Sequence, residues 1–393
     1  MNGPPWLTGL KEGGLKRLIT VSTLLVCLYL LATGGYAMLQ RFLFILGDET
    51  ALHVHLVYLA DLNGDDHQDA FLVTNQMQRI LFNDGTGKFT ANRELLMHNY
   101  ALALGDLDGN GSLDAILSNF ENGMMGGVER TECAEAPADF LLPSRSDGVL
   151  GQVFAIRDGN RDGLPEGYVA GCCGGGTSMM NYATLFENHR SCLGMNRPNA
   201  AALGDLNGDG TLDVFLANGW MLVDGQPQGY TPNEVWFNDG LGHFADSGQR
   251  LGDDQSFAVV LGDLNGDDFL DAVVGNHHGG EIWTNDGQGN FTKSNQSLGR
   301  GAVNTIFVTD LDKDGDLDLF LGGNTSIRVW LNGGAGQFKA GQRINFDRHD
   351  AVAVGDVTGD GIPDVFVGGP DSYQVWRGDG DGRFSADLRS AYR

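Results

Sequence analysis

A nine-residue acidic motif recurs seven times along this chain of 393 residues. Its general form is Asp-x-Asn/Asp-x-Asp/Asn-Gly-x-x-Asp, which places side-chain oxygens at positions 1, 3, 5 and 9 and leaves a backbone carbonyl available at position 7. Ca²⁺ takes about six to eight oxygen ligands in flexible geometry, whereas Mg²⁺ demands a rigid octahedron and keeps its waters. The motif therefore predicts loops that bind calcium ions, several and up to seven in all.

The candidate ligands occupy the same four positions in each copy. They are Asp61, Asn63, Asp65, Asp69, Asp106, Asp108, Asn110, Asp114, Asp158, Asn160, Asp162, Glu166, Asp205, Asn207, Asp209, Asp213, Asp263, Asn265, Asp267, Asp271, Asp310, Asp312, Asp314, Asp318, Asp356, Thr358, Asp360 and Asp364. An isolated Asn-Gly or Asp-Gly cluster is also typical of a hairpin turn without metal. The repetition favours metal, because seven unneutralised carboxylate clusters would repel one another and oppose folding.

Short apolar segments flank the motif and indicate which elements must hold it. Position 9 runs into Ala-Phe-Leu-Val at 70–73 and Leu-Phe-Leu-Gly at 319–322, and Val-Val-Leu-Gly at 259–262 precedes the fifth copy. An EF-hand loop instead ends in Glu at position 12 and lies between helices. These apolar runs predict buried strands, so the motif joins two strands of a hairpin. Position 6 is Gly in five copies and Asp66 or Asp268 in the others, which indicates a positive φ there.

A second phrase follows the motif in five of the repeats, as in Val-Trp-Phe-Asn-Asp-Gly-Leu-Gly-His-Phe at 235–244. An apolar strand, a glycine-rich turn and a new aromatic residue predict a second hairpin. The first residues of the seven motifs lie 45, 52, 47, 58, 47 and 46 positions apart. Four strands in each period, repeated seven times, predict an all-β fold: a seven-bladed β-propeller of four-stranded blades.

These phrases resemble the FG-GAP/VCBS repeat family, and the acidic loops are similar to the calcium loops in the propeller of integrin α chains. The resemblance covers residues from about 52 to 390. It implies that every acidic loop joins the first two strands of its blade and opens on one face of the propeller. Blades two and three depart from the pattern, because they lack the second phrase and carry expected insertions near 121–150 and 171–198.

The N-terminal region differs from the repeats. The expected parts of the chain are a cytoplasmic segment at 1–17, an uncharged transmembrane signal anchor at 18–40, a connector at 41–51 and the propeller at 52–393. A stretch of this length can span a bilayer, and basic residues before it orient the propeller to the periplasm or the cell exterior. The alternative is a signal peptide cut after Ala37, which would leave a secreted protein.

Cysteines and charge narrow the range of partners. Four cysteines lie in or beside the irregular blades; they are Cys133, Cys172, Cys173 and Cys192. Export would allow disulfides among them, and the alternative is that they are free thiols. The formal charge of −26 is a poor match for nucleic acid, so no nucleic-acid partner is expected.

The expected function is that of a non-enzymatic scaffold for protein interaction or assembly, anchored in the membrane and stabilised by calcium. No catalytic motif occurs in the sequence. A protein partner is expected to bind at the insertions of blades two and three, because the repeats already explain the other surfaces. The alternative is an exported hydrolase-type enzyme or a lectin with its site at the central channel, and carbohydrate therefore stays open as a ligand.

Overall fold

The computed structural model describes residues 54 to 391, apart from gaps at 75–77, 96–98, 106–113, 122–123, 133–151, 158–165, 173–175, 182–191, 194–197, 224–225, 242, 324, 348–350, 370 and 388. The chain divides into two compact units, Met1–Leu52 and His53–Arg393, and every described residue belongs to the second. The segments expected at 1–17, 18–40 and 41–51 thus lie outside the described residues. Within the described part of the chain, no helix is long and apolar enough to span a membrane.

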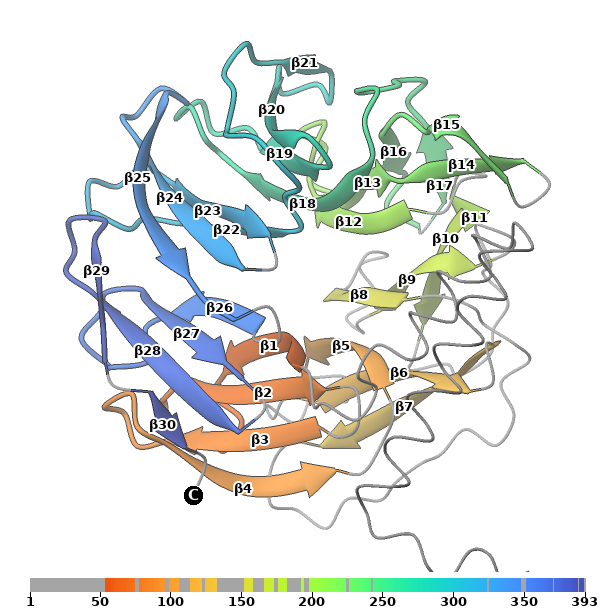
Figure 1. The fold of residues 1–393 in the computed structure, drawn as a ribbon. Coiled ribbons are helices and arrows are strands. Elements are labelled where there is room, and N and C mark those ends of the chain that lie inside the picture. Colours follow the sequence, from red (N-terminus) through yellow and green to blue (C-terminus); the bar gives the residue numbers. More distant parts are fainter. Residues whose placement is uncertain are drawn as a thin grey trace, which may run out of the picture. The chain divides into compact units, whose positions relative to one another are not determined.

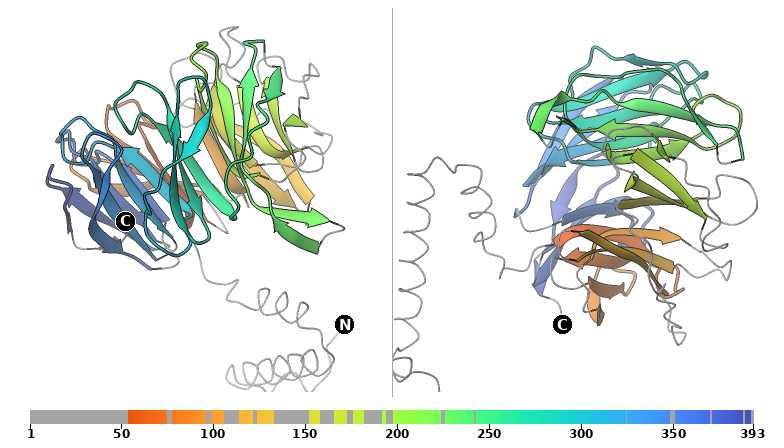
Figure 2. Two further views of the ribbon diagram at one scale, coloured as in Figure 1. Left: turned by 90° about the horizontal axis from the view of Figure 1, so that it is seen from above. Right: turned by 90° about the vertical axis from the view of Figure 1, so that its right-hand side faces the viewer.

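The described residues form strands and connecting loops, without helices (Figures 1 and 2). Among the described residues the strands make eight antiparallel sheets, of which one is an isolated two-stranded hairpin. The other seven follow one another around a ring in the order of the sequence, as Figure 1 shows. Each of these seven corresponds to one repeat of the acidic motif and is named here as one blade. The all-β class and the repeated antiparallel blades of a propeller are confirmed.

Blades 1, 5, 6 and 7 follow the predicted pattern of four consecutive strands. Blade 1 contains β1 (Val54–Ala60), β2 (Asp69–Thr74), β3 (Gln78–Asn83) and β4 (Phe89–Leu95). Blade 5 contains β18 (Ser256–Gly262), β19 (Asp271–Asn276), β20 (Gly279–Asn285) and β21 (Phe291–Lys293). Blade 6 contains β22 (Thr305–Thr309), β23 (Asp318–Gly323), β24 (Ser326–Asn332) and β25 (Phe338–Asn345). Blade 7 contains β26 (Ala351–Gly355), β27 (Asp364–Gly368), β28 (Ser372–Gly378) and β29 (Phe384–Ala386), with β30 (Ser390–Ala391) also paired to β28.

Blades 2 and 3 contain strands within the two ranges expected as insertions. Among the described residues, blade 2 has three strands, β5 (Asn99–Gly105), β6 (Asp114–Glu121) and β7 (Met124–Glu132). Blade 3 has β8 (Gln152–Arg157), β9 (Glu166–Cys172), β10 (Gly176–Asn181) and β11 (Cys192–Leu193). The range 121–150 therefore includes the third strand of blade 2, and the range 171–198 includes the outer strands of blade 3. Cys133 and Cys173 lie outside the described residues, so the disulfides stay a prediction.

Blade 4 carries an additional hairpin that the sequence analysis did not predict. Its sheet consists of β12 (Pro198–Gly204), β13 (Asp213–Asn218), β16 (Glu234–Asn238) and β17 (Phe244–Asp246), while β14 (Trp220–Val223) and β15 (Gln226–Tyr230) pair only with each other. The hairpin is inserted between the second and third strands of the blade. Its signal in the sequence was the longest interval between motifs, 58 residues from Asp205 to Asp263.

The apolar runs after the acidic motifs are buried strands, as predicted. Every described side chain of β2, β13 and β19 is buried. The same strand position carries a fully buried phenylalanine in four blades; these residues are Phe71, Phe215, Phe320 and Phe366. Because these strands have neighbours on both faces, they read as continuous apolar runs rather than alternating ones.

Apolar clusters between neighbouring blades hold the ring together. Phe215 of blade 4 lies 5.3 Å, ring centroid to ring centroid, from Phe291 of blade 5. The ring closes in the same way, since Phe89 of blade 1 lies 4.8 Å from Phe366 and 5.3 Å from Tyr373 of blade 7. Among the described residues, blades 1 and 7 each use strands from one continuous segment, so side-chain packing closes the ring without an exchanged strand.

Candidate metal centres in the acidic loops

Five acidic loops lie within the described residues, each between the first and second strands of its blade. They are named by blade: loop 1 (61–69), loop 4 (205–213), loop 5 (263–271), loop 6 (310–318) and loop 7 (356–364). In the second and third copies of the motif, the candidate ligands at positions 1, 3 and 5 lie outside the described residues. They are Asp106, Asp108, Asn110, Asp158, Asn160 and Asp162. Asp114 and Glu166 are the first residues of β6 and β9.

The carboxylate at position 1 fixes the backbone of each described loop. In loop 1, Asp61 Oδ1 accepts a hydrogen bond from Gly64 N at 2.7 Å, and Asp61 Oδ2 accepts one from Asp66 N at 2.9 Å. Burial raises the pKa of Asp61, but hydrogen bonds from four backbone N–H groups outweigh it and hold that pKa below its usual value. The same pair of acceptor contacts recurs at Asp205, Asp263, Asp310 and Asp356.

Two positions of the loop have a left-handed backbone. Position 6 has a positive φ as predicted, 67° at Asp66 and 68° at Asp268. Position 4 has one as well, and loop 6 fills it with Lys313 at a φ of 63°, where the other described loops have Gly. This second left-handed position was not predicted, although Gly recurs at position 4 of the motif in the sequence.

The carboxylate at position 9 ties the loop to two strands. Asp69 is 0% exposed, and its Oδ2 accepts from Leu62 N at 3.0 Å while its Oδ1 accepts from Asn83 N at 2.8 Å. The residue therefore joins position 2 of the loop to the end of β3. The same two bonds form at the fully buried Asp213, Asp271, Asp318 and Asp364. This group was predicted only as a metal ligand, and its two strand contacts are an additional role.

Burial makes the ionised form of the position 9 carboxyl group energetically unfavourable. Desolvation raises the pKa of the carboxyl from 3.8 to about 6 in Asp69, Asp213, Asp271 and Asp318 and also raises the pKa of Asp364. The two backbone N–H donors lower each of these pKa values only in part. A cation in the loop would offset the remaining cost, because an opposite charge nearby favours the ionised carboxylate.

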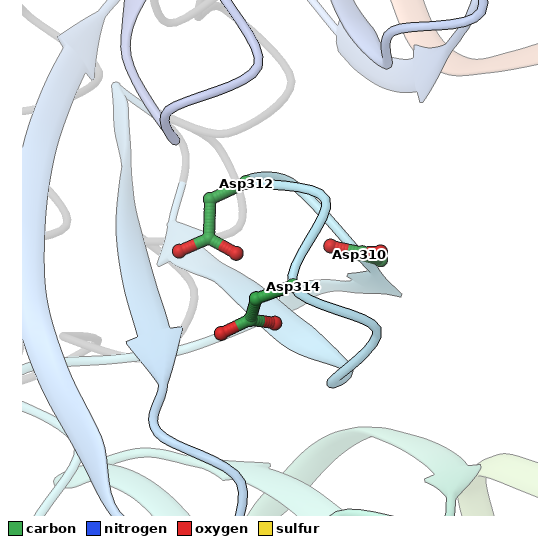
Figure 3. A group of neighbouring side chains, drawn as sticks. All are labelled: Asp310, Asp312 and Asp314. Carbon is green, nitrogen blue, oxygen red and sulfur yellow. The ribbon is translucent and has the colours of Figure 1, made fainter.

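Loop 6 brings three carboxylates together. Asp310, Asp312 and Asp314 each offer a carboxylate oxygen, and these oxygens lie within 4.8 Å of one another (Figure 3). Asp312 Oδ1 is buried and has no hydrogen-bond partner among the described residues. Burial and the neighbouring carboxylates of Asp314 and Asp310 raise the pKa of Asp312. An all-oxygen donor set with an unpartnered buried oxygen fits a hard cation such as Ca²⁺.

In loops 1 and 4, the asparagine at position 3 donates a hydrogen bond to the carboxylate at position 5. In loop 1, Asn63 Nδ2 donates to Asp65 Oδ2 at 3.0 Å, and in loop 4, Asn207 Nδ2 donates to Asp209 Oδ2 at 3.0 Å. Loop 7 has Thr358 at position 3, and its backbone N–H donates to Asp364 Oδ2 at 3.1 Å. Among the described loops, loop 6 is the one with a carboxylate, Asp312, at position 3, and it brings three carboxylates together.

An asparagine from the next blade is hydrogen-bonded to position 2 of several acidic loops. The side-chain amide Nδ2 donates to the position 2 carbonyl at 2.8 Å from Asn83 to Val357, at 2.9 Å from Asn285 to Leu206 and at 2.8 Å from Asn332 to Leu264. The sequence analysis read this residue only as the start of the Asn-Asp-Gly turn. Its recurrence at one position of the second phrase was the available signal.

Replacing Asn285 with alanine is expected to reduce the free energy of unfolding by about 1–3 kcal/mol, because it leaves the buried Leu206 carbonyl without this donor. Urea denaturation of the calcium-free protein measures the change. The control is Asn290→Ala in the same turn, where the side chain is exposed and bonds only to Asp286; its effect should stay within about 0.5 kcal/mol. Equal effects of the two variants would show that the contact between blades contributes nothing.

The fold and the repeated loop together define a class: a β-propeller built from one repeat, with an acidic loop in each blade. The FG-GAP-like repeat matches residues 61–117, 205–274, 263–321 and 310–367, which together make up more than half of the chain, so the chain belongs to this family. Each match begins at position 1 of an acidic loop. No curated protein matches the chain in sequence.

Solved structures support the fold. BBS1N in complex with ARL6DN is 12% identical, with a TM-score of 0.54 over 87% of this chain and 93% of that one. A protein from Lactobacillus plantarum is 15% identical, with a TM-score of 0.53 over 87% and 95%. A functionally unknown protein from Desulfotomaculum acetoxidans is 10% identical, with a TM-score of 0.51 over 79% and 96%. Identities this low indicate a shared fold only.

Proposed function

We propose that this protein is a calcium-stabilised, non-enzymatic propeller that serves as a scaffold for protein interaction or assembly. The observation that carries the calcium part is the convergence of three carboxylates in loop 6 around a buried oxygen that has no partner among the described residues. Asp310, Asp312 and Asp314 would hold the ion. The ion would supply positive charge that neutralises these carboxylates and stabilises the loop.

The scaffold role is preferred over the hydrolase alternative because the buried acids have a structural use. Acids with strongly raised pKa values are candidates for catalysis, but structural networks shift pKa values as well. The described carboxyls whose pKa is raised to about 6 all stand at position 9 of an acidic loop, and each accepts two backbone hydrogen bonds. These contacts account for the shifted acids without a substrate.

The partner surface is proposed on the irregular blades. The β14–β15 hairpin of blade 4 is an addition to the four-stranded repeat, and the sequence departs from the repeat near 121–150 and 171–198 in blades 2 and 3. Loops added to a rigid scaffold commonly carry binding function. BBS1N, which shares this fold, was crystallised with a protein partner. The alternative is a carbohydrate ligand with its site at the central channel.

The proposed location is the outer side of a membrane. It depends on the uncharged segment 18–40 and the basic residues before it. Export would place the acidic loops in a compartment where free calcium can fill even weak sites. Protease treatment of intact cells that express the full chain tests this topology, since only an exported propeller would be cleaved.

Calcium binding is tested by titrating the calcium-free full chain with Ca²⁺ in a calorimeter. At least one site is expected, and Asp312→Asn should weaken the tightest site tenfold or more, because it removes one of three convergent carboxylates and gives loop 6 the residue that loops 1 and 4 carry. Asp316→Asn is the control, because position 7 of loop 6 offers only its backbone carbonyl as a ligand, and it should change the affinity less than threefold. Unchanged binding in Asp312→Asn would refute the assignment of loop 6.

The scaffold role needs a separate test. Chemical crosslinking in the membranes of the native host, followed by purification of the full chain, is expected to recover a stoichiometric protein partner. Deletion of the β14–β15 hairpin should reduce that recovery while leaving the melting temperature within a few degrees of that of the wild type. Release of a bound oligosaccharide in place of a protein would favour the lectin alternative.

A further inference from the structure

Three arginines line one cavity between blades 5 and 6. The cavity has a volume of about 260 Å³, and Arg300, Arg328 and Arg343 contribute to its wall. Arg300 belongs to the connection from β21 to β22, while Arg328 and Arg343 lie on β24 and β25. No Asp or Glu lines the cavity. Such a concentration of positive charge is unusual in a protein whose formal charge is −26.

The cavity and loop 6 lie at opposite ends of strand β23. Loop 6 precedes Asp318, the first residue of β23, whereas the cavity includes Gly322, Gly323 and the turn that leads into β24. Strand β23 crosses the blade once, so its two ends lie at opposite faces of the propeller. The acidic loop is at one face, and the cavity is at the other, where second and third strands are connected. None of the three arginines belongs to an acidic loop, so the cavity is distinct from the candidate calcium sites.

The repeat shows that Arg328 departs from its neighbours. The residue two positions before the recurring tryptophan of the third strand is Glu234 in blade 4, Glu281 in blade 5 and Gln374 in blade 7, but Arg328 in blade 6. Blade 1 has Leu81 in place of the tryptophan, and its Arg79 is opposite Glu94 in the β3–β4 register. In blades 4 and 5, each glutamate has a cation beside it, with Arg250 Nε at 4.0 Å from Glu234 Oε1 and Lys293 Nζ at 2.6 Å from Glu281 Oε1. Blades 4 and 5 therefore neutralise this position within the protein.

Blade 6 instead pairs the arginine at this position with a second arginine on its outer strand. Arg328 and Arg343 are directly opposite each other in the β24–β25 register. Like charges directly opposite on adjacent strands destabilise a sheet. The Nε of Arg328 is buried and has no hydrogen-bond partner among the described residues. A buried donor without a partner costs about 1–3 kcal/mol. The blade thus carries an electrostatic cost that an external anion would remove.

We propose that this cavity binds an oxyanion, a sulfate, phosphate or carboxylate group carried by a small ligand. Guanidinium groups recognise such groups through paired, charge-assisted hydrogen bonds. Glycines at 299, 301, 322 and 323 let the ligand approach the backbone closely. The volume is slightly below the ~300–1,000 Å³ of sites for drug-sized ligands, so it accommodates an oxyanion with a small substituent. The proposal goes beyond the calcium-stabilised scaffold and does not depend on it.

The test measures the melting temperature of the calcium-free full chain in sodium sulfate, sodium phosphate or sodium glucuronate, each against sodium chloride at equal ionic strength. At least one anion is expected to raise the melting temperature by several degrees, because a ligand that binds only the folded state stabilises it. A response to sulfate and phosphate indicates a tetrahedral group, and a response to glucuronate indicates a carboxylate.

Arg328→Glu is the decisive variant, since it gives blade 6 the charge pattern of blades 4 and 5. It should raise the melting temperature in chloride, where the repulsion from Arg343 becomes attraction, and should require at least tenfold more anion for the same further rise. Arg250→Ala in blade 4 is the matched control and should keep the wild-type anion response. Arg343→Gln provides a second variant at the cavity and should also weaken the response.

Two results would overturn the assignment. One is a wild-type protein that responds to none of the three anions beyond the chloride control. The other is an anion response of the same size in wild type, Arg328→Glu and Arg343→Gln, which would indicate a general salt effect. Neither result bears on calcium binding, because calcium is absent throughout.

Discussion

Replacing Asp271 with alanine is expected to lower the free energy of unfolding of the calcium-free protein by about 2 kcal/mol or more at pH 5. The side chain is 0% exposed and accepts hydrogen bonds from Leu264 N at 3.3 Å and Asn285 N at 2.8 Å. Its loss leaves two buried backbone donors without an acceptor, each costing about 1–3 kcal/mol. At pH 5 the burial of charge is small, because the pKa of Asp271 is about 6.

The control for this prediction is Asp267→Ala in the same loop. Asp267 is exposed and accepts only from Phe269 N, at 3.0 Å, so the calcium-free protein should lose less than about 1 kcal/mol. Both residues were predicted as ligands from the sequence, and both variants should weaken calcium binding at loop 5. Urea denaturation in calcium-free buffer separates the two roles. Equal losses in the two variants would mean that position 9 is only a ligand.

The second large effect is a dependence of stability on pH that calcium reverses. Four carboxyls, those of Asp69, Asp213, Asp271 and Asp318, have a folded pKa of about 6, above the 3.8 of an exposed Asp, because they are buried. The folded protein therefore holds these protons more tightly than the unfolded chain. Without calcium, their contribution to stability is greatest below about pH 4 and is lost as the pH rises to about 6.

A shift of one pKa unit corresponds to about 1.4 kcal/mol, so the four groups together are expected to cost several kcal/mol across this interval. Bound calcium favours the ionised carboxylates and requires them, so stability in calcium should instead rise with pH. Urea denaturation at pH 4.5 and 7.0, in calcium-free and calcium-containing buffers, gives the four values needed. A calcium-free protein that becomes more stable between pH 4.5 and 7.0 would contradict the prediction. Groups whose folded pKa is lowered, such as Asp61, change their contribution to stability at a pH below the interval from about 4 to 6.

Much of the fold was predictable because the same local sequence pattern occurs seven times along the chain. The position of each acidic motif predicted the start of β2, β13, β19, β23 and β27, and all five begin at position 9. The spacing of the ligands, the backbone conformation of the turn and the apolar pattern of the strand depend on residues close together in the sequence, so each copy of the repeat shows all three. Asp66 and Asp268 even keep the left-handed backbone that Gly adopts in the other copies.

The features that sequence analysis missed depend on contacts between distant segments. Asn83 donates to Val357 across 274 positions of the chain, and no local pattern marks that partner. The β14–β15 hairpin was visible only as a longer interval, which does not reveal its strands. The difference between loop 6 and loops 1 and 4 required knowing that the Oδ1 atom of Asp312 is buried without a hydrogen-bond partner among the described residues, while Asn63 and Asn207 are bonded within their loops.

The contact between blade 7 and blade 1 has a consequence for the order of the blades along the chain. The interface uses the same kind of asparagine bond as its neighbours, from Asn83 to Val357, and Tyr373 Oη accepts from Phe89 N at 2.9 Å. Since no described strand passes from one blade to the other, this junction is a seam like any other in the ring. A circular permutant opened between blades 5 and 6, with blades 7 and 1 joined by a linker, would keep every one of these contacts. The contacts between blades therefore do not depend on which blade comes first in the sequence.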